Sequence, residues 1–324
     1  MKSIQHLKAK MRALPPWLFP RTLMYLVLRV KANRHSFAGL VRRRLAFDRR
    51  MVLVTFVDKV AARQYCRERS TSIHLPRTYQ IVESPEMLNP NLWPEECAIK
   101  PSFGSGALVM ITEGKKPGFQ YSLKSSKFRW DDGYYGVARD EIDLDKLRQV
   151  CAKWLESSYE YWTIKYPEWA YRHVPRRVIV EEVVQNLDGS PAIELRLHCF
   201  HGKVALIRVT DVVRGSVAWS FDREGRSIPA RLESEAEVNT GKSPLPPSWE
   251  FAVIEAEKIS AGIDYVRVDL YATDHGVYFS ELTPYPNGGF VDFAPKEVSR
   301  WLAELWKFGP DSERGPNSRP VVTN

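Results

Sequence analysis

The stretch Tyr265-Val-Arg-Val-Asp-Leu-Tyr-Ala-Thr-Asp-His-Gly-Val-Tyr-Phe-Ser-Glu281 predicts a β-hairpin that carries acidic residues. Apolar residues alternate with Arg267 and Asp269 along the first strand, so these two side chains share one face. Asp274-His275-Gly276 suits a three-residue hairpin loop with glycine in the left-handed position. The register that such a loop sets places Asp269 opposite Glu281 on the second strand.

Two carboxylates directly across an antiparallel pair repel each other. At about 5 Å and an effective dielectric constant near 20, the repulsion amounts to roughly 3 kcal/mol. Arg267 lies on the same face, so one interpretation is a structural cluster of Arg267, Asp269 and Glu281. The other is a Mg²⁺ site with oxygen ligands that bridges nucleotide phosphates. The hairpin alone leaves both open.

A second informative stretch is Lys100-Pro-Ser-Phe-Gly-Ser-Gly106, which lies between predicted strands at 96–101 and 107–112. This order predicts a hairpin with a glycine-rich turn, unlike the strand–turn–helix of a dinucleotide fold or a P-loop. Backbone N–H groups near Gly104 and Gly106 can approach an anion closely. Many such turns are ordinary hairpin turns, but the lysine at the strand end favours a turn that covers phosphates.

The run Val180-Glu-Glu-Val-Val184 places two consecutive acids in a predicted strand, where one must face each side. One acid could accept a hydrogen bond from an adenine amino group while the backbone near Val183 and Val184 pairs with the ring edge. Solvated acids at a strand edge are the alternative.

The rest of the chain alternates helical and strand patterns without internal repeats. Aromatic residues cluster between Tyr159 and Tyr171, where they could line an acceptor or sugar-binding pocket or belong to the core. The tail after Gly309 is expected to be disordered. Helices are predicted at 51–70, 140–158, 250–261 and 295–308, and further strands at 178–184, 192–200, 203–212, 217–221, 265–271 and 277–282.

Composition excludes several protein classes. With 44% hydrophobic and 27% charged residues, the 324-residue chain is neither disordered nor low in complexity. The four cysteines are scattered without a CxxC pair, which argues against a disulfide framework or zinc ribbon. No apolar run reaches the roughly 18 residues of a membrane-spanning helix. His198-Cys199-Phe200-His201 looks like a metal motif, but strand geometry sends the two histidines to opposite faces, so we interpret it as structural.

The net charge of +8 is concentrated at the N-terminus. Residues 1–50 hold 13 of the 47 Lys and Arg residues but only one of the 39 acids, Asp48, so the remainder is mildly acidic. These numbers disfavour nucleic acid as a partner. The apolar run 23–28 within the basic segment could form an interfacial helix on an anionic membrane. The other interpretation is a helix whose apolar face docks on the body of the protein.

Five motifs follow one another over roughly residues 50–300. They are Val57-Asp-Lys-Val-Ala-Ala-Arg-Gln-Tyr65, Ile99-Lys-Pro-Ser-Phe-Gly-Ser-Gly106, Val178-Ile-Val-Glu-Glu-Val183, Glu194-Leu-Arg-Leu-His-Cys-Phe-His-Gly-Lys203, and Val266-Arg-Val-Asp-Leu-Tyr271 with Tyr278-Phe-Ser-Glu-Leu-Thr-Pro284. Together, and in this order, they resemble the ATP-grasp fold, and more narrowly the TupA-like ATP-grasp family associated with teichuronopeptide and other surface-polysaccharide biosynthesis.

The resemblance implies an α+β protein of two subdomains, whose mainly antiparallel sheets grip ATP between them, plus a basic helical N-terminal segment. It also implies roles in nucleotide binding. Lys59 and Lys100 would hold the phosphates, and either Glu194 or Arg196 would reach the ribose or phosphates. The flexible lid would consist of Ser102, Gly104, Ser105 and Gly106, and the adenine site of Glu181 and the backbone of Glu182, Val183 and Val184.

For catalysis, the resemblance implies that Arg267, together with Lys100, stabilises the transferring phosphoryl group, and that Arg267 also stabilises a tetrahedral intermediate. Asp269 and Glu281 would ligate Mg²⁺. Thr283 stands where many ATP-grasp ligases have asparagine, and this departure weakens a second metal site more than the fold assignment.

The activity implied is that of a carboxylate–amine ligase that consumes ATP with Mg²⁺, joining a small-molecule or glycan carboxylate to an amine. A kinase, or a non-catalytic membrane- or polymer-binding protein, is the alternative. A cytoplasmic location is expected, with possible contact to the inner face of the membrane. The expected divisions are 1–50 (basic segment), 51–95 (helical linker), 96–175 (lid subdomain), 176–308 (large subdomain with the metal site) and 309–324 (tail).

Overall fold

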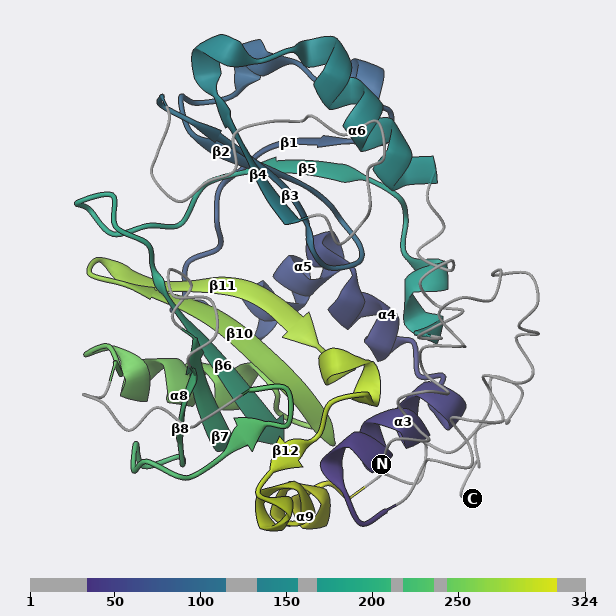
Figure 1. Cartoon of the computed structure of the whole chain (residues 1–324), viewed down its shortest axis with the longest axis vertical. Coiled ribbons are helices and arrows are strands. Elements are labelled where there is room, and N and C mark those ends of the chain that lie inside the picture. Colours follow the sequence, from purple (N-terminus) through teal and green to yellow (C-terminus); the bar gives the residue numbers. More distant parts are fainter. Residues whose placement is uncertain (1–33, 115–132, 157–167, 211–217, 236–243, 308–324) are drawn as a thin grey trace.

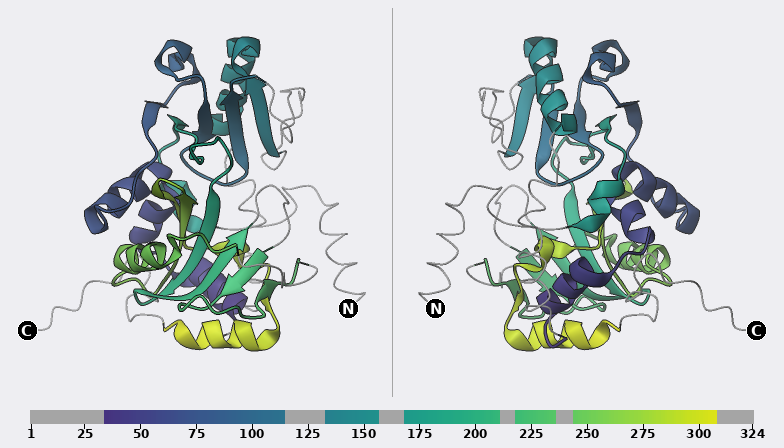
Figure 2. Two further views of the ribbon diagram at one scale, coloured as in Figure 1. Left: turned by 90° about the vertical axis from the view of Figure 1, so that its left-hand side faces the viewer. Right: turned by 90° about the vertical axis from the view of Figure 1, so that its right-hand side faces the viewer.

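The structure is a computed structural model that describes residues 34–114, 133–156, 168–210, 218–235 and 244–307. Two lobes, each built on a five-stranded sheet, lie one above the other (Figure 1). In the side views of Figure 2, helices α4 (Val52–Val57) and α5 (Lys59–Arg69) lie along one side of the molecule, near the level where the lobes meet. The predicted α+β architecture with mainly antiparallel sheets is confirmed.

The upper lobe of Figure 1 contains the predicted glycine-rich hairpin. Its strand order is β1-β5-β2-β3-β4, and all neighbours are antiparallel except β3 and β4. Strand β4 was not predicted, and the helix expected at 140–158 begins later, at Leu144, after a short 3-10 turn. The bounds are β1 Thr78–Val82, β2 Cys97–Pro101, β3 Ala107–Thr112, β4 Gly133–Ala138, β5 Val178–Glu181 and α6 Leu144–Glu156.

The lower lobe contains the predicted acidic hairpin as β10 and β11. Its sheet has the order β11-β10-β6-β7-β8 and is antiparallel throughout. A small sheet of β9 and β12 lies beside it. The bounds are β6 Ile193–Phe200, β7 Lys203–Thr210, β8 Ala218–Phe221, β9 Arg231–Leu232, β10 Tyr265–Thr273, β11 Gly276–Thr283, β12 Phe293–Ala294, α8 Trp249–Ile259 and α9 Lys296–Leu305.

One face of the large sheet is apolar and packs on α8. Leu197, Cys199 and Val268 point to this face and are fully buried, and Cys199 Sγ lies 3.9 Å from the carbonyl oxygen of Ala256 in α8. Burying a large apolar side chain in this way contributes about 2 to 3 kcal/mol. This packing holds the strands rigidly from behind and leaves their other face for chemistry.

The opposite face of the sheet carries aromatic residues at one end of the strands and charged residues further along. At one end Tyr265 packs against Phe37 of α3 (Phe37–Phe47) and against Trp306, with ring centroids 5.2 and 4.3 Å away. Two and four residues further along β10 the same face carries Arg267 and Asp269. An aromatic cluster thus closes one end of this face, and the charged end lies next to it.

The single helix predicted at 51–70 is wrong in one respect, because it is broken at Asp58. Asp58 has an extended backbone, and its Oδ1 accepts a hydrogen bond from Val60 N at 2.9 Å, which caps α5. Its other oxygen pairs with Arg177 at 2.7 Å. Apolar spacing continues on both sides of the break, so periodicity alone concealed it. The break makes Lys59 the first residue of α5.

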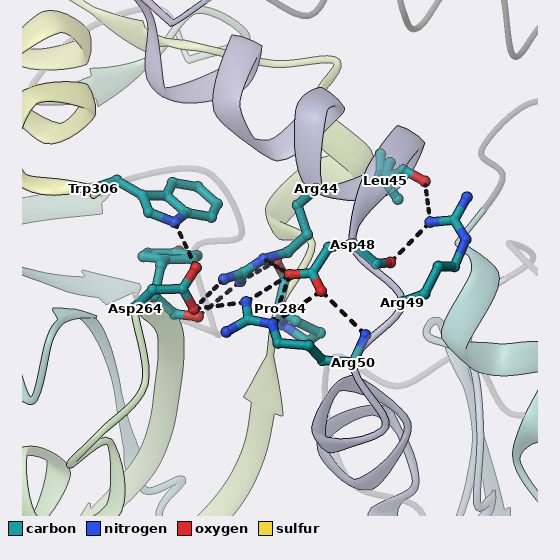
Figure 3. Close-up of polar contacts among 9 residues, drawn as sticks. Arg44, Leu45, Asp48, Arg49, Arg50, Asp264, Pro284 and Trp306 are labelled. Carbon is teal, nitrogen blue, oxygen red and sulfur yellow. Dashed lines mark hydrogen bonds and ion pairs between the residues drawn. The ribbon is translucent and has the colours of Figure 1, made fainter. Parts of the chain in front are cut away.

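Helix α3 docks on the body of the protein through a buried arginine (Figure 3). Arg44 is 0% exposed. Its Nη1 donates to the carbonyl oxygens of Tyr265 at 2.7 Å and Pro284 at 3.3 Å, and its Nη2 pairs with Asp264 at 2.7 Å. Tyr265 begins β10 and Pro284 directly follows β11, so one guanidinium joins the two strands of the acidic hairpin at the same end.

The same cluster contains a second arginine from the basic segment. Arg50 pairs with Asp48 at 2.6 Å and with Asp264 at 2.9 Å, and Trp306 Nε1 donates to Asp264 at 3.2 Å. Part of the N-terminal positive charge therefore neutralises buried acids. The apolar run 23–28, on which the membrane and docking interpretations depend, lies outside the described residues, as does the tail.

The remaining structural predictions have mixed outcomes. All four cysteines are free and buried, which agrees with the expected lack of disulfides. His198 is buried, with Nδ1 3.0 Å from the Tyr265 hydroxyl, whereas His201 lies exposed in the turn after β6. Trp169 and Tyr171 pack against the core, and the rest of the aromatic cluster at 159–167 falls outside the described residues. No helix in the described ranges is long and apolar enough to cross a membrane.

Candidate active site between the two lobes

The acidic hairpin has the predicted pairing but a different loop. Asp269 is opposite Glu281, whereas nearer the tip Leu270 pairs with Phe279 and Thr273 with Gly276. The loop therefore has two residues instead of three. A β-bulge at Ser280 adds one residue to β11 and restores the register at the acids. The shorter loop and the extra residue of the bulge compensate for each other, so Glu281 faces the same side of the sheet as Asp269.

Arg267 lies within this acid pair. Its Nε and Nη2 donate to the two oxygens of Asp269 at 2.7 and 2.5 Å, and Nη2 lies 3.3 Å from Glu281 Oε1. Nη2 also donates to the Thr283 hydroxyl at 3.0 Å, and that hydroxyl donates to Glu281 at 2.9 Å. Arg267, Asp269, Glu281 and Thr283, predicted to act together, therefore form one hydrogen-bonded group.

The arginine does not fully offset the burial of Asp269. This side chain is 1% exposed, and burial raises the pKa of Asp269 above its usual range despite Arg267, with Glu281 and Glu194 adding to the increase. For Glu281 the balance is reversed. Burial opposes ionisation, but Lys59 first and then Arg267 hold the pKa of Glu281 below its usual range. Arg267 therefore does not fully stabilise the charged form of Asp269, and a further cation close to Asp269 would be favourable.

The donor set suits Mg²⁺. It consists of two carboxylates and a hydroxyl, all oxygen ligands, and protein Mg²⁺ sites commonly combine one or two carboxylates with substrate phosphates and water. In the part of the chain that the structure describes, no group of three or more His, Cys, Asp or Glu residues gathers to form a complete cage. An ion at Asp269 and Glu281 would need phosphate oxygens to complete its coordination.

The two predicted phosphate lysines lie near this group. Lys59 Nζ donates to the carbonyl oxygen of Gly104 at 2.6 Å, and the backbone N of Lys59 donates to the carbonyl oxygen of Ser102 at 2.8 Å. Lys100 forms an ion pair with Glu181. The charges of both lysines lower the pKa of Glu281, and α5, which carries Lys59, contacts β11. Lys100 from the upper lobe and Lys59 from α5 therefore both lie near the acid pair of the lower lobe.

The glycine-rich turn divides into an anchored and an exposed part. Ser102 is fully buried, and its hydroxyl donates to Pro175 at 2.9 Å. Ser102, predicted to belong to the flexible lid, is anchored, because its hydroxyl ties the turn to the chain before β5. Gly104 and Gly106 have φ of 72° and 80°, which favours glycine, and Ser105 and Gly106 are exposed. These two are the positions free to contact a ligand.

The predicted adenine segment begins at the end of β5. Glu181 is buried and pairs with Arg63 and with Lys100, so its carboxylate is engaged by cations instead of standing free for an adenine amino group. The Glu182 side chain accepts from Arg77 N at 2.8 Å. Val183 and Val184 are half-buried and follow the end of the strand, where their backbone groups lie outside the sheet ladder. The backbone groups of Val183 and Val184 therefore remain candidates for contact with adenine, whereas the carboxylate of Glu181 already pairs with cations.

Glu194 and Arg196 lie on the same face as the acids. Arg196 is opposite Asp269 in the register of β6 with β10, and its Nη2 pairs with Glu194 at 2.6 Å. Both can reach a nucleotide bound over Asp269, and the choice between them stays open.

Sequence reasoning missed two arginines at this site. Arg63 lies one helical turn after Lys59, and this i, i+4 spacing was a usable signal. Arg208, on β7, is opposite Arg196. No local pattern marks it, because only the pairing of β6 with β7 brings it to this face.

Two lobes with mainly antiparallel sheets, a glycine-rich hairpin in one and an acidic hairpin in the other, define the ATP-grasp fold. The family model for TupA-like ATPgrasp matches residues 38–307, and the chain belongs to this family. No curated protein matches it significantly.

Solved ATP-grasp structures resemble the chain at low identity. The ATP-grasp ligase PsnB, complexed with a minimal precursor, is 13% identical with a TM-score of 0.36, covering 72% of this chain and 54% of its own. D-alanine–D-alanine ligase from Bacillus anthracis, complexed with ATP, is 14% identical with a TM-score of 0.39, and the match covers 78% of this chain and 63% of the ligase. PurK, an N5-carboxyaminoimidazole ribonucleotide synthetase, is 12% identical with a TM-score of 0.39, and the match covers 72% of this chain and 46% of PurK. The chain spans less than two thirds of each of these proteins.

We expect nucleotide binding to depend on the charge of Lys59. Burial, with Lys100 nearby, lowers the pKa of Lys59 to about 8 in the free protein. A bound triphosphate favours the charged amine, so affinity for Mg²⁺–AMP-PNP should fall as the pH rises through about 8. The Lys59→Met variant should bind about 10- to 100-fold more weakly at pH 7 and lose this pH dependence. Calorimetric titrations at pH 7 and pH 9 measure both effects.

Lys258→Met is a matched control, because Lys258 is a half-exposed lysine paired with Glu255 in α8, away from the acid pair. It should behave as the unmodified protein. Parallel pH profiles for the Lys59 variant and the unmodified protein would exclude Lys59 as the titrating group.

Proposed function

We propose that the protein is an ATP-dependent carboxylate–amine ligase that works through an acyl phosphate. The observation that carries this proposal is the acid pair Asp269 and Glu281 facing Lys59 and Lys100, in a chain of the TupA-like ATP-grasp family. Such an arrangement neutralises charge around a transferring phosphoryl group, which is the main source of catalysis in phosphoryl transfer.

In the first step, an oxygen of the substrate carboxylate attacks the γ-phosphorus of ATP, and the bond from that phosphorus to the ADP oxygen breaks. Lys59 and Lys100 bind the phosphates, and Arg267 stabilises negative charge on the transferring group. Mg²⁺ held by Asp269 and Glu281 would supply further charge neutralisation there.

In the second step, the amine nitrogen attacks the acyl carbon, the carbon–oxygen bond to phosphate breaks, and the nitrogen loses a proton. Arg267 would stabilise the oxyanion of the tetrahedral intermediate. No nucleophilic side chain is needed, which agrees with four cysteines that are all buried and free.

Hydroxylamine trapping tests the proposal without knowledge of the amine. The protein is incubated with Mg²⁺–ATP, a panel of carboxylic acids and hydroxylamine, which attacks an acyl phosphate to give a hydroxamate. We expect hydroxamate and ADP in equal amounts, both dependent on the acid. A stable phosphorylated product without hydroxamate would identify a kinase instead. Nucleotide binding without acid-dependent ADP release from any acid would favour a non-catalytic role.

The biological substrate belongs to the same proposal. The resemblance to the TupA-like family supports a glycan or glycan-precursor carboxylate and a role in polysaccharide or glycoconjugate biosynthesis in the cytoplasm. The concentration of positive charge in residues 1–50 supports peripheral contact with an anionic membrane. Any such contact has to come from the basic residues that Asp48 and Asp264 do not already neutralise.

A further inference from the structure

A row of charged side chains crosses the large sheet. The register places Glu281 on β11, Asp269 on β10, Arg196 on β6 and Arg208 on β7 opposite one another in sequence across the strands. With strands about 4.8 Å apart, Arg196 lies one spacing and Arg208 two spacings, about 10 Å, from Asp269. Acids occupy one end of the row and arginines the other.

The two arginines at this end of the row repel each other, which by itself disfavours the folded state. Arg196 and Arg208 are directly opposite on neighbouring strands, and like charges in such pairs repel. Arg208 is only 4% exposed. Burial lowers the pKa of Arg208, and although Glu235 raises it, Arg196 and Arg267 lower it further. Two guanidinium groups therefore lie on neighbouring strands, each paired with one acid, Glu194 for Arg196 and Glu235 for Arg208.

Both guanidiniums also keep unused donors. Arg208 uses Nη2 for Glu235, at 2.6 and 2.8 Å, and Arg196 uses Nη2 for Glu194. The Nε atoms of both are buried, and within the described ranges neither has a hydrogen-bond acceptor. Buried donors without partners are uncommon in folded proteins. An anionic ligand group that replaced Glu235 could pair with the Arg208 guanidinium.

The nucleotide does not account for Arg208. Lys59 and Lys100, which would bind the phosphates, act on Glu281 at the β11 edge of the sheet. Arg208 lies at the other end of the row, beyond Arg196. A molecule whose reacting carboxylate lies over Asp269 and Arg267 would extend toward Arg208 by one or two strand spacings.

We propose that Arg208, with Arg196, forms a subsite for a second carboxylate of the acid substrate, so that the substrate is a molecule with two carboxylates about 5 to 10 Å apart. This rests on the proposed ligase function. Glu235 occupies the subsite in the unliganded protein and gives way to the substrate.

The test compares acids that differ only in the distal group. Glutarate, adipate and pimelate are compared with their monocarboxylate and ω-amide counterparts in the hydroxylamine assay. We expect the diacids to have a kcat/KM at least about tenfold higher. Arg208→Gln should lower kcat/KM for the diacids about 10- to 100-fold and leave the monocarboxylates and the affinity for Mg²⁺–AMP-PNP unchanged. Glu235→Gln should lower KM for the diacids, because it removes the competing carboxylate.

Arg226→Gln, which removes a similar but exposed arginine–carboxylate pair with Asp222, is the matched control and should leave the diacid preference intact. Equal use of diacids and monoacids, or an equal loss for both in Arg208→Gln, would overturn the subsite while leaving the ligase proposal in place. A thermal-shift titration with the diacids and Mg²⁺–AMP-PNP separates the two proposals. An Arg208-dependent shift without any hydroxamate would support the subsite and contradict the ligase. The absence of both would overturn the subsite.

Discussion

Replacing Asp269 with asparagine is expected to lower the rate of Mg²⁺-dependent ADP release about 100- to 1000-fold. Asparagine keeps the size of the side chain and one oxygen, but it removes the negative charge that would hold Mg²⁺. It also leaves the charge of Arg267 without its closest carboxylate, at 2.5 and 2.7 Å. Rates measured at saturating ATP over a range of Mg²⁺ concentrations should show a higher Mg²⁺ requirement as well as a lower maximum.

The matched control is Asp274→Asn at the exposed tip of the same hairpin. Asp274 accepts a hydrogen bond from Leu187 N, which asparagine can also accept, so this variant should retain the full rate. Near-normal activity in the Asp269 variant, with normal folding, would remove the acid pair from the mechanism and support a purely structural Arg267–Asp269–Glu281 cluster.

Replacing Arg44 with methionine is expected to destabilise the protein by about 3 to 5 kcal/mol, since it removes one of the two arginines that pair with the buried acids Asp48 and Asp264. Two carbonyl oxygens, of Tyr265 and Pro284, lose a donor at the same time. The melting temperature should fall by roughly 5 to 8 °C. Differential scanning calorimetry measures this, with ADP release as a second readout because both strands of the acidic hairpin are joined at Arg44.

Two variants sharpen the result. Arg226→Met removes an exposed ion pair and should change the melting temperature little. Arg44→Lys keeps the charge but cannot reach three acceptors at once, so it should fall between the methionine variant and the unmodified protein. A melting temperature for Arg44→Met equal to that of Arg226→Met would show that the cluster contributes no net stability.

Acid titration gives a further check on the same cluster. Although burial opposes ionisation, Arg44 and Arg50 lower the pKa of Asp264 to about 2. The folded pKa is below the unfolded value, so this acid contributes roughly 2 kcal/mol of stability above pH 4, which is lost as the pH falls toward 2. The Arg44→Met variant should show a smaller loss of stability over this window.

The sequence predicted most of the fold because its signals were local. Alternation identified both strands of the acidic hairpin, and glycine turns separated the strands of the large sheet. The pairing of Asp269 with Glu281 was right although the predicted loop was one residue too long. The bulge at Ser280 compensated, and nothing in the sequence distinguishes a bulge from an ordinary strand residue at that position.

The errors concern features that depend on contacts between distant segments. Asp58 caps α5 by a local hydrogen bond from Val60 N, and its other oxygen pairs with Arg177, far along the chain. The Ser102 hydroxyl is buried because Pro175 accepts its hydrogen bond. Arg208 reaches the candidate site only through strand pairing. Ser102 and Arg208 carry no local signal, so their roles depend on the fold, whereas aspartate is a preferred N-cap residue and Asp58 could have marked the helix break.

The helix that carries Arg44 bears on how parts of this protein could be exchanged with those of a relative. A chimera joined at residue 50 would bring in a foreign helix against Tyr265 and Pro284, and the strands beside Arg267 would lose the side chain that unites them. A junction placed ahead of Ser36 keeps helix and strands from one parent. Swapped N-terminal segments can then be compared without disturbing the acids that would bind the metal.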